Sequence, residues 1–372
     1  MLAAESKSTP SRLRLPGPPS RSLRLGVIGA GWVSRACHLP SLDALRQSGW
    51  PITVAAIADY AAPAIATAAA AVPNLLRDAE SFTEGEALLQ AAARLRLDAV
   101  LLLTQPEVTI TLLRSCLVLG LTTFAEKPVA DEAATLQALV EAAARPDAPP
   151  VQVGYNRRWQ PLAPDFREHL SHFQRTSPSG VHVEANLWRA TRGEAIFYRD
   201  TMIHAVDFLQ WCLGPLEVCR VTVWPPLAPD GIASGLRAEL RTTGDAAPAT
   251  VHLDVRPSVG RNRESYLALG QKASAELTYT PANRDIEPAL LSVWDSSDGP
   301  GSRIWEAPLS PVAGDPILWE RGFLPQMAGF LSLVSEGDKA TNRCSLADAL
   351  AARQITDSIL SYQTVPALPD KS

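Results

Sequence analysis

Paired cysteines and long apolar runs are both missing from this sequence. Its five cysteines are scattered, and none lies in a C-x-x-C pair. An odd, dispersed set of cysteines favours reduced thiols in a cytoplasm and argues against a zinc site. No apolar run approaches the roughly 20 residues that a membrane helix needs. We therefore predict a cytoplasmic protein with no metal and no membrane-spanning segment.

An excess of basic charge is also missing. The net charge is -5 at pH 7, so the chain offers no basic field for a nucleic acid. Residues 1–21 are rich in Ser, Pro and Arg but contain no apolar h-region, so we expect a disordered tail rather than a secretory signal. With 46% hydrophobic and 20% charged residues over 372 positions, the chain has the composition of a globular protein with two domains.

The stretch from Leu23 to Ser34 organises the rest of the chain. A short apolar run ends in Gly29-Ala30-Gly31, and Ser34 occupies the third small position of the pattern G-x-G-x-x-G/A. The first glycine allows a tight turn, the second lets a pyrophosphate approach the backbone, and the helix that follows offers free N–H groups. A plain glycine turn is the alternative for this pattern alone. The predicted cofactor-binding residues are Gly29, Ala30, Gly31, Trp32 and Val33.

An acidic residue follows the second predicted strand. Residues 52–58 are almost continuously apolar, as in a buried parallel strand, and Asp59 comes next. An acid at this position accepts the ribose hydroxyls of NAD. NADP needs a cation for its 2′-phosphate, and residues 60–62 supply none. We predict NAD, with NADP less favoured; a solvated acid at the end of a strand is the alternative. The interval from Gly31 exceeds the roughly 20 residues usual for this motif.

Strands and helices alternate over the first 150 residues. This order indicates βαβ units and a parallel sheet, so we predict a Rossmann dinucleotide-binding domain over residues 22–150. Two turns are expected at its carboxyl edge, where ligands bind: Thr104-Gln105-Pro106 and Glu126-Lys127-Pro128. A residue before proline is held extended, so Lys127 is expected to project from a fixed backbone, unless it is a surface lysine in a turn. Further strands are predicted at 98–103, 121–124 and 151–154, and helices at about 32–46, 61–71, 81–95, 109–120 and 131–144.

The pattern changes after the Pro-rich linker at 145–150. Apolar and polar residues alternate, which predicts an antiparallel sheet with one solvated or interface face. The fold class is therefore α/β, an N-terminal Rossmann domain plus a C-terminal α+β domain (151–372) with a mainly antiparallel open sheet. Its last helix, from Ser345 to about Tyr362, is expected to pack back toward the first domain. The predicted strands lie at 181–185, 218–224, 236–241, 250–255, 266–269 and 290–294.

A second group of functional candidates lies between two of these strands. The apolar stripe within residues 198–211 predicts one helix, on which Asp200 and His204 share a face. A carboxylate one turn before an imidazole can orient it and raise its basicity. A capping Asp with a structural His is an equally open interpretation. Asp207 is a weaker candidate for a supporting partner. His38, near the glycine turn, is more plausibly structural than catalytic.

Taken together, these motifs resemble those of the Gfo/Idh/MocA oxidoreductases. The glycine turn, Asp59, Glu126-Lys127-Pro128, the segment 154–158 (Gly-Tyr-Asn-Arg-Arg) and Asp200-x-x-x-His204 occur in the order and spacing of that family. The resemblance spans about residues 22–362. It implies a Rossmann domain, an α/β domain with an open sheet, and a homo-oligomer.

The resemblance also implies roles for individual residues. His204 would be the general base, Asp200 would bind a substrate hydroxyl or orient that base, and Lys127 would contact the nicotinamide ribose and the reacting oxygen. Further residues are expected near the substrate or the cofactor. On the substrate side these are Tyr155, Asn156 and Arg158; on the cofactor side they are Thr104, Gln105, Pro106 and Glu126.

Two features depart from the family pattern. Many members carry a His where Thr109 or Ile110 stands here, and the glycine-rich turn before the Asp-His helix is replaced by residues 192–199. An aromatic and basic cluster precedes Asp200. It either holds an acidic or phosphorylated sugar or consists of solvated arginines on a surface strand. The cluster comprises Trp188, Arg189, Arg192 and Arg199.

The predicted function is hydride transfer between the CH–OH group of a sugar, cyclitol or polyol and a nicotinamide cofactor, an NAD(P)-dependent dehydrogenase reaction. Two alternatives stay open: a redox-neutral glycosidase that uses NAD, and a non-catalytic sensor of NAD or sugar. Retention of Lys127, Asp200 and His204 argues against the sensor.

Overall fold

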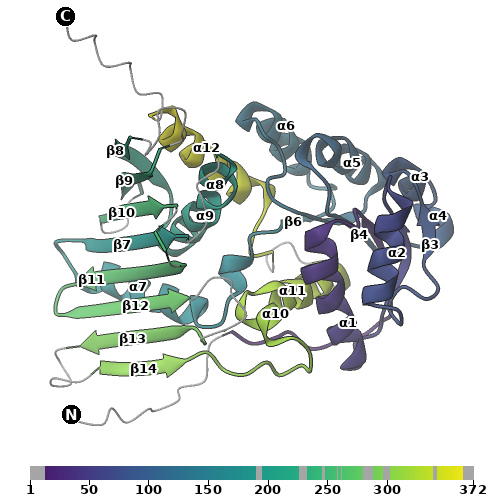
Figure 1. Ribbon diagram of the computed structural model, residues 1–372, viewed down its shortest axis with the longest axis horizontal. Helices are drawn as coiled ribbons and strands as arrows, with labels where there is room; N and C mark the ends of the chain where they lie inside the picture. The colour runs from purple at the N-terminus through teal and green to yellow at the C-terminus, as the bar shows by residue number, and fades with distance from the viewer. Residues whose placement is uncertain are drawn as a thin grey trace, which may run out of the picture. The chain divides into compact units, whose positions relative to one another are not determined.

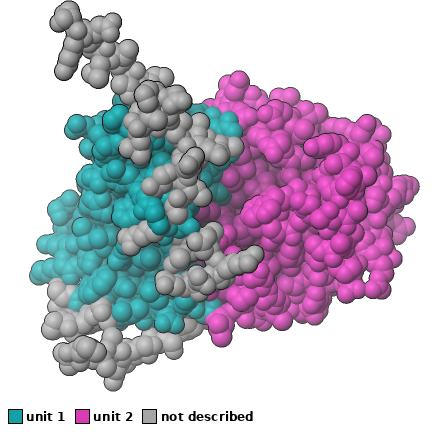
Figure 2. Space-filling model, in the orientation of Figure 1, with its two compact units in different colours: residues 1–13, 161–308, 351–372 teal, residues 14–160, 309–350 magenta. Residues whose placement is uncertain are grey.

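The computed structural model describes residues 13–189, 195–225, 233–244, 248–257, 259–260, 262–279, 288–295, 302–337 and 342–362. The chain divides into two compact units (Figure 2). Unit 2 comprises Arg14–Gln160 and Leu309–Leu350, and unit 1 comprises Met1–Leu13, Pro161–Pro308 and Ala351–Ser372. Most of the tail predicted at residues 1–21 lies outside the described residues, and 13–21 form no helix or strand.

Unit 2 is built on a six-stranded parallel sheet in the order β3-β2-β1-β4-β5-β6 (Figure 1). This is the strand order of a dinucleotide-binding Rossmann fold, which confirms the predicted fold class of this part. The carboxyl ends of β1 and β4, which are neighbours, flank the point where the strand order reverses. The strands are β1 (Leu23–Ile28), β2 (Ile52–Ala58), β3 (Glu80–Phe82), β4 (Ala99–Leu102), β5 (Thr122–Ala125) and β6 (Val151–Val153).

The first helix contains a π-helical turn, η1 (Ser34–His38), before α1 (Leu39–Gln47). Pro40 has no N–H to donate to the carbonyl of Ala36, so the α-helical pattern is interrupted and the Leu39 N–H bonds to the Ser34 carbonyl instead. The helix predicted from Trp32 to Arg46 is otherwise present. The remaining helices of this segment are α2 (Ala62–Ala71), α3 (Gly85–Gln90), α4 (Ala92–Leu95), α5 (Pro106–Leu119), α6 (Ala133–Ala143) and the 3-10 helix η2 (Asn156–Trp159).

The helix predicted at 81–95 is wrong at its start. Residues 80–82 pair with β2 as strand β3, and two short helices follow. At Gly85 the chain passes close to β1, because a Cβ there would lie 2.9 Å from the Ile28 side chain.

Residues 309–350 complete unit 2, although they are distant from it in sequence. They form α10 (Pro316–Glu320) and α11 (Phe323–Glu336), neither of which was predicted. Phe323 and Phe330 of α11 lie edge-on against His38 and Phe124 respectively, each with ring centroids 5.6 Å apart. Helix α11 therefore covers an apolar surface of the parallel sheet and its first helix.

Unit 1 contains an eight-stranded sheet in the order β14-β13-β12-β11-β7-β10-β9-β8 (Figure 1). Neighbouring strands are antiparallel except for β7 and β10, which run parallel. The mainly antiparallel sheet is thus confirmed, while β12 and β14 were missed. The strands are β7 (Val181–Trp188), β8 (Leu216–Trp224), β9 (Gly235–Thr242), β10 (Ala249–Arg256), β11 (Arg263–Gly270), β12 (Ala273–Tyr279), β13 (Leu290–Asp295) and β14 (Ser302–Glu306).

Helices cover one face of this sheet. Helix α7 (Ala163–Thr176) buries Phe166, Leu170 and Phe173, and it packs with α9 (Met202–Leu213) on β7. Strand β7 buries every second side chain, so its other side chains face away from the helices. Helix α12 (Leu346–Ser361) follows near the end of the chain. Within the described residues, no helix is both long and apolar enough to span a membrane.

The single helix predicted over 198–211 is wrong. Helix α8 (Ala195–Asp200) ends before Thr201, and α9 begins at Met202. Asp and Thr are weak helix formers because their side chains compete for nearby backbone groups. Asp200 and His204 therefore stand on two successive helices, and the shared face expected of a continuous helix does not apply.

Packing of α11 on unit 2 can be tested at Gly329. A Cβ at this position would lie 2.0 Å from the indole ring of Trp159, so Gly329→Ala overpacks the contact. We expect the variant to lose about 1–3 kcal/mol of unfolding free energy in a denaturant titration. Ser335→Ala on the same helix is the control and should stay within roughly 0.5 kcal/mol of the wild type. Equal stability of Gly329→Ala and the wild type would contradict the contact.

Candidate active site

The glycine turn after β1 has the geometry that its sequence predicts. Gly29 has φ +103°, and a Cβ there would lie 2.4 Å from the Leu103 carbonyl oxygen at the end of β4. A side chain is thus excluded twice, by the backbone conformation and by the neighbouring strand. A Cβ on Gly31, in contrast, would meet no atom within 4 Å. This glycine faces open space, as expected where a pyrophosphate approaches the backbone.

Asp59 fastens this turn to the end of β2. One carboxylate oxygen accepts the Ala30 N–H at 2.7 Å, and the other accepts the Ala61 N–H at 2.8 Å. The predicted ribose ligand therefore also holds the glycine turn and the start of α2. A carboxylate offers about four acceptor sites, so both oxygens keep capacity for hydroxyl donors.

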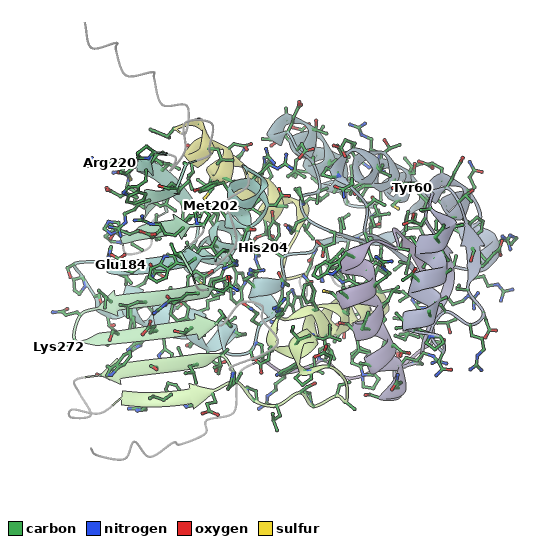
Figure 3. The ribbon with its side chains drawn as sticks, viewed as in Figure 1. Tyr60, Glu184, Met202, His204, Arg220 and Lys272 are labelled. Carbon is green, nitrogen blue, oxygen red and sulfur yellow. The ribbon has the colours of Figure 1, made fainter. Side chains whose placement is uncertain are left out.

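A pocket of about 680 Å³ lies at this edge of the sheet. It brings together five of the predicted cofactor residues: Gly29, Gly31, Asp59, Thr104 and Gln105. Tyr60, which is 91% exposed, also lines it (Figure 3). Among the described residues of its lining there is no Lys or Arg. The lining includes the carboxylates of Asp59, Glu84, Glu86 and Glu107.

The turn after β4 is fixed by two threonines. The Thr104 and Thr109 hydroxyls lie 2.8 Å apart in a hydrogen bond, and Thr109 is buried. Pro106 begins α5, where a missing N–H costs nothing. Thr109, one of the two positions at which the family resemblance led us to expect a His, therefore stabilises the turn. Of the other predicted cofactor residues, Trp32 is 70% exposed and Val33 is half-buried, both in the first helical turn.

Glu126 holds the backbone that carries Lys127. One carboxylate oxygen of Glu126 lies 2.7 Å from His38 Nε2, and the other accepts the Lys127 N–H at 2.9 Å. Gly154 makes room, because a Cβ there would lie 2.9 Å from this carboxylate. The Lys127–Pro128 peptide bond is cis. His38 thus makes a buried contact with Glu126, and the same carboxylate holds the Lys127 N–H.

Tyr155, Asn156 and Arg158 are buried in unit 2. Arg158 Nη1 donates to the Arg343 carbonyl at 2.6 Å and lies 3.1 Å from the Asp348 carboxylate. Burial raises the pKa of Asp348, but the charge of Arg158 and hydrogen bonds from Ser345 outweigh it and hold the pKa below its ordinary value. Arg158 therefore ties the segment after β6 to the start of α12. Its contact with a substrate stays a prediction.

Asp200 and His204 belong to unit 1. Asp200 Oδ1 accepts from Arg199 Nε at 2.8 Å, and His204 is 7% exposed in the first turn of α9. Asp207, on the next turn, is fully buried. The paired catalytic roles of Asp200 and His204 stay a prediction.

The aromatic and basic cluster separates into distinct contacts. Arg189 pairs with the buried carboxylate of Glu264 at 3.3 Å, Arg199 pairs with Asp200, and Trp188 lies under Arg263. Arg192 lies outside the described residues. Arg189 and Arg199 are thus engaged by carboxylates of unit 1 itself.

Sequence reasoning missed the carboxylates at 84, 86 and 107 and the partnership of His38 with Glu126. Glu84 and Glu86 follow β3, which was itself missed, so their place at the carboxyl edge could not be inferred. Cys37, beside His38, is chemically inert: burial, with a further contribution from Glu126, raises the pKa of its thiol to about 12.

Comparisons with known proteins agree with this architecture. Residues 23–155 match the model of the Gfo/Idh/MocA family, described as an oxidoreductase family with an NAD-binding Rossmann fold. Inositol 2-dehydrogenase of Corynebacterium glutamicum is 29% identical over 221 residues, covering 59% of this chain and 62% of the relative. The enzyme of the same name from Serratia proteamaculans is 28% identical over 208 residues, covering 55% and 58%. The chain thus spans about three fifths of the length of these relatives.

Solved structures match over more of the chain. A Gfo/Idh/MocA oxidoreductase from Vibrio cholerae has a TM-score of 0.65 at 22% identity and covers 92% of this chain and 100% of its own. A 3-ketoreductase from Actinomadura kijaniata, in complex with TDP-benzene and NADP, has a TM-score of 0.66 at 16% identity, covering 92% and 98%. At these identities the likeness shows the fold.

Unit 2 therefore has an NAD(P)-binding Rossmann fold. Residues 23–155 are similar to the Gfo/Idh/MocA oxidoreductases.

The two glycines of the turn should respond differently to substitution. Gly31→Ala adds a methyl group to open space, so we expect unchanged stability without cofactor and a dinucleotide Kd raised at least tenfold, about 1.4 kcal/mol. Gly29→Ala should instead lower thermal stability, because its Cβ collides with Leu103. Calorimetric titration and thermal unfolding measure the two effects. Tight dinucleotide binding by Gly31→Ala would contradict this placement of the pyrophosphate.

Proposed function

We propose that this protein is an NAD-dependent dehydrogenase that oxidises a CH–OH group of a cyclitol or a related sugar or polyol. The observation that carries the proposal is the acidic dinucleotide pocket around Gly31 and Asp59, in the same unit as Lys127 on its Glu126-anchored backbone. The matched relatives named inositol 2-dehydrogenase support a cyclitol as the first substrate to test.

Each proposed role follows from what the reaction requires. A bound nicotinamide accepts the hydride, so this chain must hold the alcohol and remove its O–H proton. We assign proton removal to His204, whose imidazole can take a proton near neutral pH. Asp200 binds a substrate hydroxyl or orients that imidazole. Lys127 stabilises negative charge that develops on the reacting oxygen. Tyr155 and Arg158 are proposed to support substrate binding.

Selectivity for NAD follows from the charge of the pocket. Asp59 is half-buried and its carboxylate is fixed by two N–H groups, so it cannot easily withdraw from a 2′-phosphate. The pocket carries further carboxylates and, among its described lining residues, no cation. A 2′-phosphate would therefore meet repulsion, whereas ribose hydroxyls would find acceptors. The Actinomadura 3-ketoreductase binds NADP on the same fold, so this choice rests on the local side chains rather than on the fold.

The cofactor preference can be measured directly. We expect a kcat/KM at least tenfold higher with NAD than with NADP for the wild-type protein. Asp59→Asn removes the charge and keeps one acceptor, so the ratio should fall toward unity. Glu107→Gln, also in the pocket lining, is the control for general charge and should change the ratio less. A higher kcat/KM with NADP in the wild-type protein would overturn the assignment.

The reaction itself is tested with myo-inositol and a panel of sugars and polyols, following nicotinamide reduction by absorbance. We expect His204→Asn to lower kcat by roughly 10²- to 10⁴-fold, as for loss of a general base. Lys127→Met should lower kcat by a similar order. Both variants should bind NAD in calorimetry, which separates chemistry from folding.

His172→Asn is the matched control for the histidine variant, since His172 is exposed on α7. Full activity of His204→Asn would refute its role. Release of a sugar from a glycoside without lasting nicotinamide reduction would refute the dehydrogenase assignment.

A further inference from the structure

A cluster of metal-ligand side chains lies on the outer face of the sheet in unit 1. His182 and Glu184 of β7 and His252 of β10 each offer one ligand atom, and these atoms lie within 4.8 Å of one another. His182 Nε2 is 2.7 Å and His252 Nδ1 is 2.9 Å from the same oxygen, Glu184 Oε1. The two imidazole rings are 4.6 Å apart, centroid to centroid. The three side chains thus converge on one small volume.

The pairing of β7 with β10 sets the positions of the three side chains without a bound ion. Strands β7 and β10 are the parallel neighbours within the sheet, and their register sets His252 opposite Glu184 and Thr250 opposite His182. Residues two apart on a strand point to the same face, so His182 and Glu184 share the outer face. Strand β11 pairs with the far side of β7, and β9 with that of β10. The ligands therefore stand on two interior strands rather than on loops.

The Thr250 hydroxyl orients the imidazole of His182. His182 Nδ1 lies 2.9 Å from the Thr250 hydroxyl, which leaves Nε2 directed at the cluster. Metal-bound imidazoles commonly use their second ring nitrogen in this way, which fixes the tautomer and the ring orientation. Thr250 thus holds the imidazole of His182 in the orientation that a metal ligand needs.

Charge and access also suit a cation. The carboxylate of Glu184 lies between the two imidazoles, with one oxygen within hydrogen-bond distance of each ring. The side chains are 29–34% exposed, so an ion can enter from solvent. Nearby arginines are paired elsewhere: Arg237 and Arg256 contact Asp254, and Arg241 contacts Glu217.

We propose that His182, Glu184 and His252 form a binding site for a divalent transition-metal ion of the zinc class, with water completing the coordination. Two imidazoles and one carboxylate suit Zn²⁺ and its neighbours Co²⁺ and Ni²⁺, whereas Ca²⁺ and Mg²⁺ prefer oxygen ligands alone. The absence of a cysteine zinc motif in the sequence does not bear on this set, because it contains no thiolate. On binding, the ion replaces the two hydrogen bonds to Glu184, and each protonated ligand releases its proton.

The site is independent of the proposed dehydrogenase chemistry. Helix α9, which carries His204, packs on the inner face of β7, and Glu184 points from the outer face (Figure 3). We therefore expect His252→Ala to retain the dehydrogenase activity of the chelator-treated wild type. Failure of either proposal leaves the other intact.

The test is metal titration of chelator-treated, full-length protein that carries no polyhistidine tag. We expect Co²⁺ to give a visible d–d absorption that saturates near one equivalent per chain and that Zn²⁺ displaces. His182→Ala, His252→Ala and Glu184→Gln should each weaken Zn²⁺ binding at least tenfold in competition with a chromophoric chelator. Thr250→Val should weaken it less, roughly tenfold or below, as for an outer-shell partner.

Two controls keep the test specific. His172→Ala removes an exposed histidine from α7, and Cys219→Ser removes an exposed thiol on β8; neither should change binding. Glu184→Gln retains the size of the side chain, so circular dichroism and thermal unfolding of this variant should match the metal-free wild type. Absence of Co²⁺ binding, or binding that survives His252→Ala and Glu184→Gln, overturns the proposal. Loss of binding in Cys219→Ser alone overturns it as well.

Discussion

The buried carboxylate of Glu126 connects three segments of unit 2 that are far apart in the sequence. It contacts the imidazole of His38 and the N–H of Lys127, and it fills the space left by the missing side chain of Gly154. One group therefore ties the end of β5 to the first helix and to the end of β6. A buried polar group is tolerated only where its hydrogen-bond partners are in place, and leaving one unsatisfied typically costs about 1–3 kcal/mol. The backbone at Lys127 is thus set by core packing.

Asp59, which follows β2, likewise connects separate segments of unit 2. Its two hydrogen bonds hold the glycine turn and the start of α2, while the same carboxylate lines the dinucleotide pocket. Under the proposed role of Asp59, one residue would both build the turn and accept the ribose hydroxyls, so cofactor selectivity would depend on the same contacts as folding. A change of the proposed NAD preference to NADP would then require a new anchor for the Ala30 N–H as well as a new cation.

Local patterns predicted the parallel sheet and its glycine turn because both depend on residues that are close together in the sequence. Gly29 needs a positive φ, β1 and β2 are apolar runs, and the alternation of β7 has period two. The errors have a different origin. Thr201 interrupts a helix whose apolar stripe continues through the break. Helix α11 belongs to unit 2 because of contacts with Phe124 and Trp159, far away in sequence.

The candidate site residues show the same contrast between what a local pattern predicts and what contacts distant in sequence decide. The sequence motif identified Lys127, Asp200 and His204 as candidates, but it does not show which residues hold them in place. Glu126 holds the Lys127 backbone through a hydrogen bond that sequence spacing alone does not predict. His182 of β7 and His252 of β10 lie in strands of alternating pattern, which alone places each of them on a face of the sheet. Their convergence on Glu184 depends on parallel register between β7 and β10, in a sheet whose pattern favours antiparallel neighbours. Alternation places a side chain on a face, and only strand pairing decides which side chains on that face can share a ligand.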